Sequence, residues 1–447
     1  MAFKWIIQSF KNNLKNICKN SYYSSKMVKN ERQAGGYMEF GALIKFYRTQ
    51  RGITQAELAK GICSVPHLSK IENNSKEANE ETISLLLERL NISLEEMEEK
   101  EEQIKVLLRE LNANINFYLR DEVDETYQKF KKIEHIIPFS KHIYNCELYK
   151  YRYLLFKGLF AEAESQRDLL YKQKKNFSQH EDYLFRYFNA IFLILRGQFK
   201  NADYILDALY TENDHETTSG EFLYHRALVK SSLEQSGHAI HFGKMALQIF
   251  MNQHNFLRIL HTLMLLGINY THSKIYEEAE GCFRHLIRNA ELLRQEKMLP
   301  QIYHNMGYLQ NKMKNVKEAL YYYEKSLELQ SNFNQHYLVT LYSVGEMHYC
   351  LKDTDKAKEC LQEVASLSKE LGNKKYRLLA DFYLFHMASP QKAFKYLETK
   401  VIPYFEEANE HIDDLTRFYK MLSDYYNENG LVHEAVKYLN KITGGIL

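Results

Sequence analysis

A chain of 447 residues is too long for one hydrophobic core, so two or more structural units are expected. Only 18 glycines and 5 prolines leave little of the turn punctuation that sheet-rich folds need, which predicts an all-α protein. The formal net charge of +2 identifies no class of partner, the six cysteines form no C-x-x-C metal site, and no apolar run approaches the ~20 residues of a membrane span. The scattered cysteines are typical of small apolar side chains in a reducing compartment, so we expect a soluble, cytoplasmic protein.

Residues 1–37 form a basic extension that carries six lysines and no acidic residue as far as Asn30. Its apolar run is too short for a signal peptide. Gly35 to Met38 is what a purine-rich ribosome-binding site would encode if it were translated. We interpret residues 1–37 as an extension that is either untranslated, with Met38 as the start, or a disordered tail that adds phosphate contacts.

Between residues 38 and 93 the apolar residues follow a helical period and predict four short helices. Thr54 is placed to cap the second helix. Ser64 is placed to cap the third, with Pro66 in the first turn, where a missing N–H costs nothing. The fourth helix is expected from about Glu80 to Leu90.

The stretch RTQRGITQAELAKGICSVPHLSKIENN, residues 48–74, resembles the Cro/cI or Xre-type helix-turn-helix family. The resemblance implies a DNA-binding domain at residues 38–93 whose third helix enters the major groove. Carried over position by position, it implies a phosphate-contacting Gln55 and a structural ion pair between Arg48 and Glu72. The base-reading candidates that it implies are Ser64, Val65, Pro66 and His67, with Lys70 at the edge.

The third helix departs from the family pattern at Pro66 and His67, where relatives carry polar amides. Pro66 cannot make a bidentate base contact, and His67 either donates to a guanine or a phosphate or is a solvated residue of the first turn. Five Lys or Arg against three Glu in residues 38–75 give this region a mild charge of +2. Because one such domain binds DNA weakly in salt, we expect a homodimer that reads two half-sites of an operator.

Residues 76–110 reverse this balance, with eleven Glu against five Lys or Arg. Within them, residues 94–111 are predicted to form an acidic linker helix. Its near-heptad leucines allow three interpretations: pairing across a dimer, docking on the following domain, or a solvated helix with one buried stripe. The acidic face is not expected to lie against DNA.

Residues 112–447 show an internal repeat of about 40 residues. In the clearest copies a glycine stands twelve residues before a recurring alanine, as Gly307 stands before Ala319, and in others a glycine five residues before it marks a turn. This spacing resembles the tetratricopeptide repeat and predicts about eight helical hairpins in a right-handed superhelix. The recurring alanines are Ala163, Ala202, Ala239, Ala279, Ala319, Ala357, Ala393 and Ala435.

The sequence contains no phosphate-binding glycine loop, no H-E-x-x-H and no G-x-S-x-G motif. Its eighteen histidines are scattered, and solvated or core-edge histidines are commoner than metal ligands. We therefore predict that the protein is not an enzyme and that it holds no metal or cofactor.

The first helices of a repeat array line its concave face, which binds extended peptides. Asparagine suits such a face because its amide can both donate to and accept from a peptide backbone. The peptide-binding candidates on first helices are Asn305, His304, Tyr308, Asn269, Tyr224, His225, Tyr342 and Glu346.

An Xre-type domain followed by about eight long tetratricopeptide units resembles the RRNPP receptors of Gram-positive bacteria. The order of domains and the segment Ile62 to Glu72 are most similar to the PlcR and NprR branch. The resemblance implies a quorum-sensing transcription factor in which a short oligopeptide binds the concave groove and changes the spacing of two DNA-binding domains. Two alternatives are a phosphorelay modulator that binds or dephosphorylates a response regulator, and a repressor whose repeats only dimerise.

Overall fold

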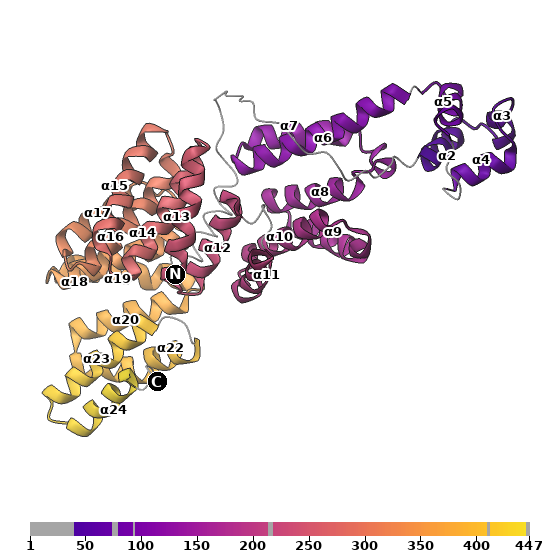
Figure 1. Ribbon diagram of the computed structural model, residues 1–447. Coiled ribbons are helices and arrows are strands. Elements are labelled where there is room, and N and C mark those ends of the chain that lie inside the picture. The colour runs from indigo at the N-terminus through magenta and orange to yellow at the C-terminus, as the bar shows by residue number, and fades with distance from the viewer. Residues whose placement is uncertain (1–39, 74–78, 93, 213–217, 409–411, 444–447) are drawn as a thin grey trace. The chain divides into compact units, whose positions relative to one another are not determined.

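The computed structural model describes residues 40–73, 79–92, 94–212, 218–408 and 412–443, and in these ranges every regular element is helical (Figure 1). The all-α prediction is thus confirmed. The chain divides into two units, which we treat separately: one reaches Thr262 and the other begins at Leu263. The basic extension of residues 1–37 lies outside the described residues. Within the described ranges, no helix has both the length and the apolar character needed to cross a membrane.

Four short helices form the helix-turn-helix region, as predicted. They are α2 (Phe40–Gln50), α3 (Gln55–Ala59), α4 (Val65–Glu72) and α5 (Glu80–Arg89). Thr54 caps α3 in a reciprocal capping box with Glu57. Ser64 caps α4, with proline in its first turn. Both predicted caps are confirmed.

The core of this region includes side chains from beyond its expected boundary. Leu43, Leu58 and Leu86 are fully buried in a cluster that also contains Ile136, from the segment before the 3₁₀ helix η1 (Ile137–Phe139). The ring of Phe139 packs on that of Phe46, with centroids 5.0 Å apart. The helix-turn-helix region is therefore packed against the segment that follows α7, whose Ile136 comes 44 residues after Ile92 of the same cluster.

The acidic linker is part of one continuous helix, α6 (Leu94–Asn116). No glycine or proline interrupts it at residue 111, so the helix runs through the position at which we separated linker from repeats. Ile104, Leu107 and Leu111 are buried within the single chain, where α6 packs on α7 (Arg120–Lys132) and α8 (Ile143–Lys157). Of the three interpretations of these leucines, the contacts of the described residues agree with docking on the repeats.

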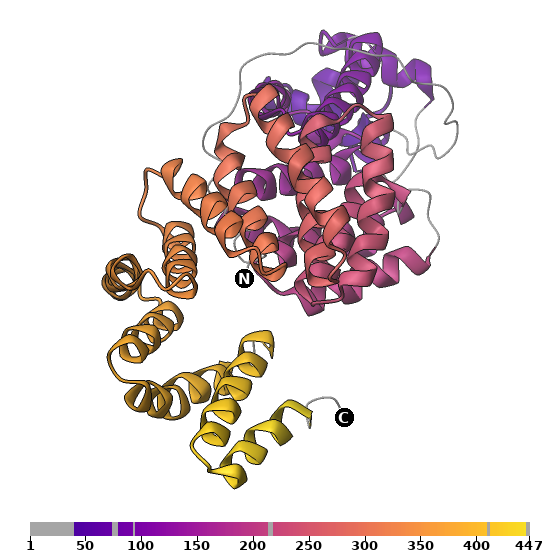
Figure 2. The same ribbon diagram turned by 90° about the vertical axis from the view of Figure 1, so that its left-hand side faces the viewer.

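The remaining helices pair into antiparallel hairpins (Figures 1 and 2). In the first unit α8 pairs with α9 (Phe160–Gln173), α10 (Gln179–Leu195) with α11 (Phe199–Thr211), and α12 (Gly220–Ser232) with α13 (Ser236–Asn252). The unit boundary falls within α14 (Phe256–His272), which precedes α15 (Tyr276–Leu292). The second unit continues with α16 (Leu299–Lys312) and α17 (Val316–Glu328), α18 (Gln335–Cys350) and α19 (Thr354–Glu370), α20 (Lys374–Ala388) and α21 (Pro390–Tyr396), and α23 (Ile412–Glu428) and α24 (Val432–Thr443). Helix α21 runs on through η5 (Leu397–Val401) into α22 (Ile402–Ala408), and η2 (Lys174–Asn176) and η4 (Glu296–Met298) are short connections.

The eight recurring alanines all lie on second helices of hairpins, and each is at most 3% exposed. Opposite them, a Cβ added at Gly307 would lie 2.7 Å from the ring of Tyr323, and one at Gly267 would lie 2.8 Å from the ring of Phe283. These two glycines therefore let an aromatic ring of the second helix contact the backbone of the first, and Gly345 does the same for the side chain of Leu361. The predicted repeat register is confirmed.

In every hairpin except that of α20 and α21, the turn adopts a left-handed backbone conformation at the position five residues before the alanine. Gly158, Gly197 and Gly430 occupy it with φ between 71° and 78°. In other hairpins the same position holds Lys314, with φ 65°, or a comparable non-glycine residue. An L-residue in this conformation costs about 1–2 kcal/mol, so these turns carry strain that the glycine turns avoid.

Gly307→Ala should destabilise the second unit by about 1–3 kcal/mol, because the new methyl group overlaps the Tyr323 ring and forces the two helices apart. The measurement is the denaturant midpoint of unfolding, followed by circular dichroism. The matched control is Gly281→Ala in α15, where an added Cβ has no neighbour within 4 Å and alanine is the better helix former. Equal midpoints for the two variants would contradict the close packing.

Lys314→Gly should stabilise the second unit by about 0.5–1 kcal/mol, because relief of the left-handed strain exceeds the added entropy of the unfolded chain. The same denaturation experiment measures it. Gly430→Ala tests the converse at the equivalent turn and should lower stability. A loss of stability in Lys314→Gly would show that the lysine side chain stabilises the turn by more than its backbone costs.

Candidate functional site

Helix α4 presents the predicted base-reading residues at its exposed N-terminal end. Ser64, Val65 and Pro66 are exposed and His67 is half-buried. The hydroxyl of Ser64 accepts from the His67 amide at 3.3 Å, so this side chain serves the helix as its cap. Lys70 lies one turn further along and is exposed. Their contacts with DNA stay a prediction.

Glu72 connects three helices of the region. Arg48 donates to both of its carboxylate oxygens, at 2.6 and 3.0 Å, and also to the Ile53 carbonyl at 2.9 Å. The side-chain hydrogen bond with Glu72 raises the pKa of Arg48. Gln55 Nε2 donates to Glu72 Oε2 at 2.7 Å, which leaves one amide hydrogen of Gln55 for a phosphate. The structure contains the predicted Arg48–Glu72 ion pair, and the role of Gln55 stays a prediction.

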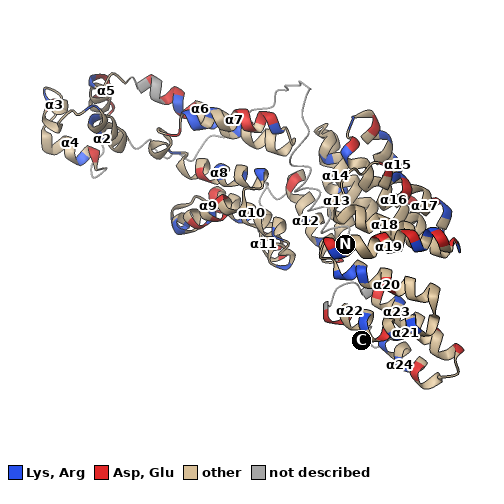
Figure 3. Ribbon diagram, turned by 180° about the vertical axis from the view of Figure 1, so that it is seen from behind, with Lys and Arg blue, Asp and Glu red and all other residues tan. Residues whose placement is uncertain are grey.

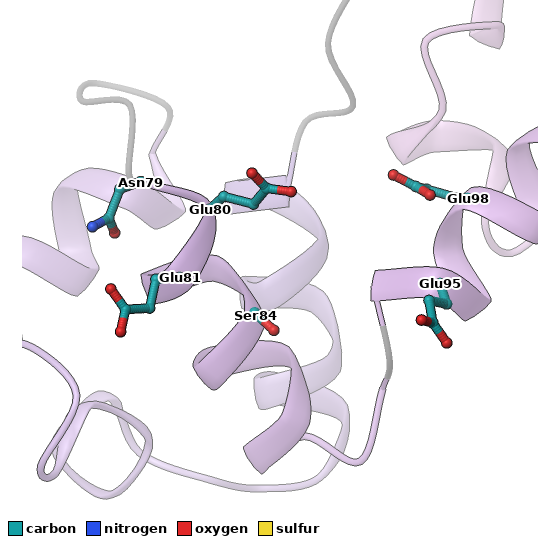
Figure 4. Close-up of a pocket in the computed structure, with 6 residues that line it drawn as sticks. All are labelled: Asn79, Glu80, Glu81, Ser84, Glu95 and Glu98. Atoms are coloured by element: carbon teal, nitrogen blue, oxygen red, sulfur yellow. The ribbon is translucent and has the colours of Figure 1, made fainter.

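The surface between α5 and α6 is strongly acidic. A recess of about 590 Å³ is lined by Glu80, Glu81, Glu95 and Glu98, together with Asn79 and Ser84 (Figure 4). Four carboxylates at one recess repel phosphates, so this surface is unsuited to DNA. Acidic and basic side chains both occur along α6 and α7 (Figure 3).

Two of the predicted peptide-binding residues, Tyr224 and His225 on α12, belong to the first unit. Tyr224 is 1% exposed and lies in the core. His225 Nδ1 lies 2.9 Å from the hydroxyl of Tyr187. Burial lowers the pKa of His225 to about 3, so the imidazole is neutral near pH 7.

Four more of these residues lie on α14 and α16 of the second unit. Asn269 is fully buried and donates to the Leu265 carbonyl at 2.8 Å. Asn305 is also buried, with Nδ2 3.3 Å from the Met264 sulfur. His304 and Tyr308, one turn apart on α16, are half-buried. His304 Nδ1 also lies 3.0 Å from the Thr340 hydroxyl. On α16, Asn305 is thus buried, whereas His304 and Tyr308 keep part of their surface exposed.

Tyr342 and Glu346 on α18 belong to a buried polar network. Glu346 Oε1 accepts from the hydroxyls of Tyr342 and Tyr383, at 3.4 and 2.7 Å, and from Arg417 Nη1 at 2.7 Å. These contacts join α18, α20 and α23. Tyr342 and Glu346 thus have a structural role in connecting these helices. Contact with a peptide stays a prediction for all eight candidates.

A second buried polar network, which lies in the first unit, was not predicted from the sequence. Glu221 accepts from Arg152 Nη2 at 2.5 Å and from Arg258. Burial alone would raise the pKa of Glu221, but these two guanidinium groups lower it to about 2. The available signal was an arginine inside an apolar run, as Arg152 is in the segment from Tyr151 to Phe156.

Comparisons with known proteins agree with both parts of the chain. The helix-turn-helix family model matches residues 44–97, and the tetratricopeptide repeat model matches residues 299–370. The transcriptional activator NprA of Geobacillus stearothermophilus is 26% identical over 398 residues, which cover 85% of this chain and 97% of NprA. The regulatory protein RapD of Bacillus subtilis (strain 168) is 24% identical over 324 residues, covering 69% of this chain and 88% of RapD.

The fold is similar to that of the quorum sensor NprR from B. thuringiensis. The apo form gives a TM-score of 0.68 at 22% identity and covers 78% of this chain and 99% of NprR. The structure of NprR in complex with its cognate peptide NprX gives a TM-score of 0.59 at 21% identity and covers 77% of this chain and 98% of that one. At these identities the likeness shows only the fold of the part that is covered. The helix-turn-helix region and the tetratricopeptide repeats are identified by the two family models.

Glu72→Ala should destabilise the helix-turn-helix region by about 3 kcal/mol, because it leaves the half-buried Arg48 guanidinium without its carboxylate. Hydrogen–deuterium exchange of peptides from residues 40–92 measures this local loss in the full chain. The double variant Arg48→Met/Glu72→Leu, which removes both charges, should recover most of the protection. If the double variant lost as much protection as Glu72→Ala or more, the Arg48–Glu72 pair would not act as a unit.

Proposed function

We propose that this chain is a regulator of the RRNPP type, a transcriptional regulator that binds operator DNA through α4 and senses a short peptide through its repeats. One observation carries the proposal. The match to a transcriptional activator covers 85% of this chain and 97% of NprA. The same chain contains a helix-turn-helix match at residues 44–97 and a tetratricopeptide match at residues 299–370, which are the two parts that such a regulator needs.

The geometry of the helix-turn-helix region supports DNA binding. Val65 and Pro66 are exposed at the start of a capped helix, and the Arg48–Glu72 ion pair holds α2 and α4 together. Such a helix enters the major groove with its N-terminal residues toward the bases. A single domain of this kind with a mild positive charge binds weakly in salt, so the functional form is a homodimer on two half-sites.

The repeat array supports peptide sensing. NprR was solved in complex with its cognate peptide, and the present chain shares its fold. The half-buried His304 and Tyr308 provide a hydrogen-bonding ring and an aromatic surface on a first helix. Peptide binding would couple to DNA binding through the relative spacing of the two helix-turn-helix regions of a dimer.

The first arm of the test is fluorescence anisotropy of labelled DNA from upstream of the gene, titrated with the full chain. His67→Ala should weaken binding about five-fold or more if this side chain reads a base. It should also spare the fold, since the cap on α4 uses only the His67 backbone. The control is Lys358→Ala, an exposed cation on α19 that should leave DNA affinity unchanged. Equal affinity for the operator and for scrambled DNA would exclude the regulator.

The second arm adds short peptides encoded by small reading frames beside the gene. We expect a peptide to change the affinity for DNA, and Tyr308→Ala to weaken this response while Tyr321→Ala, on the exposed side of α17, leaves it intact. Specific DNA binding that ignores every peptide would favour a regulator whose repeats only dimerise. Without specific DNA binding, capture of a response-regulator domain would favour the phosphorelay alternative.

A further inference from the structure

The polar network of the first unit carries more positive than negative charge. Arg152 on α8 and Arg258 on α14 are 5% and 1% exposed, and both donate to the single carboxylate of Glu221. The other titratable groups here are neutral near pH 7, because burial lowers the pKa of His225 to about 3 and raises that of Tyr118. Two buried cations thus share one anion, and an uncompensated buried charge is unfavourable.

The network faces a cavity of about 50 Å³ inside the first unit. Its polar lining comes from Tyr118, Arg152, Glu221, His225 and Arg258, and aliphatic and aromatic side chains of α8, α10 and α12 complete the wall. A cavity needs about 10–15 Å³ of such space to hold one water, so this cavity suits a group of a few heavy atoms, such as a carboxylate. The helices that line it are the first helices of successive hairpins.

Each arginine has a hydrogen-bond donor left over. Arg152 Nε and Arg258 Nη1 are buried, and neither has a hydrogen-bond partner among the described residues. Arg258 is otherwise held in place, with Nε donating to the Asn116 carbonyl at 3.1 Å and its guanidinium 4.5 Å from the centre of the Tyr118 ring. Two oriented donors beside an excess positive charge are what an oxyanion requires.

We propose that this cavity is a binding site for one carboxylate group, which a peptide ligand supplies from an acidic side chain or from its C-terminus. The assignment of the carboxylate to a peptide rests on the proposed function. The carboxylate would neutralise the second guanidinium and accept from Arg152 Nε and Arg258 Nη1. Because Arg152, Glu221 and Arg258 come from α8, α12 and α14, the bound group would connect three hairpins.

Formate tests the site without a peptide. The full chain is melted in sodium formate and in sodium chloride of equal ionic strength, and we expect a saturable rise of the melting temperature in formate only. Arg152→Gln should weaken the apparent affinity for formate about ten-fold or more. Arg284→Gln, an exposed arginine on α15, should not change it.

Glu221→Gln should change the affinity for formate in the opposite direction to Arg152→Gln. It removes the competing carboxylate, so formate should bind more tightly and give a larger rise of the melting temperature than in the parent chain. General unfolding could not produce this increase. Identical melting in the two salts, or an equal formate response in the parent chain and in Arg152→Gln, would overturn the proposal and leave the cavity as a site for water.

A hexapeptide library identifies the source of the carboxylate. Peptides retained by the full chain are measured by mass spectrometry for three libraries: free C-termini, amidated C-termini, and amidated C-termini without Asp or Glu. We expect the third to be retained least, and Arg152→Gln to remove the difference. Retention that is independent of carboxylates would overturn this inference and leave peptide sensing standing. A formate response with no retained peptide would support the site and overturn peptide sensing.

Discussion

The close contact between the two helices of each hairpin is the constraint on which the array depends. On the second helix the recurring residue is alanine, as at Ala279 and Ala319, and both are fully buried. Four residues later a large side chain, Phe283 or Tyr323, lies against a glycine of the first helix. A methyl group at that glycine would overlap the ring, so the sequence fixes the distance between the helices through two small residues.

The first helices carry most of the buried side chains of each hairpin, as α10 does compared with α11 and α16 compared with α17. Polar groups on the first helices are therefore buried too, and they hydrogen-bond to one another. The buried networks of the two units differ in their numbers of anions and cations. In the second unit Glu346 faces Arg417, one anion against one cation, with tyrosine hydroxyls around them. In the first unit Glu221 faces two arginines, so only that network has positive charge to spare.

The parts of the structure that could be predicted are those that local spacing determines. The caps at Thr54 and Ser64 and the register of the alanines each depend on residues less than a few turns apart. The direction of polar side chains on the first helices could not be predicted in the same way. In α12 every residue from Gly220 to Ser231 is buried, because the helix packs on neighbours on all sides. Periodicity distinguishes a buried face from an exposed one, and α12 has no exposed face to serve as reference.

The helix-turn-helix region is joined to the repeats of the first unit by more than the linker. Ile136, from the turn between α7 and α8, completes its core, and the Phe139 ring packs on α2. Beside this contact Ser140 donates to the buried Glu101 of α6 at 3.0 Å. The segment before α8 therefore contacts both α6 and the helix-turn-helix region. Arg152 lies on α8, the helix that this segment begins, so the network around Glu221 and the core of the helix-turn-helix region are connected through one continuous stretch of chain.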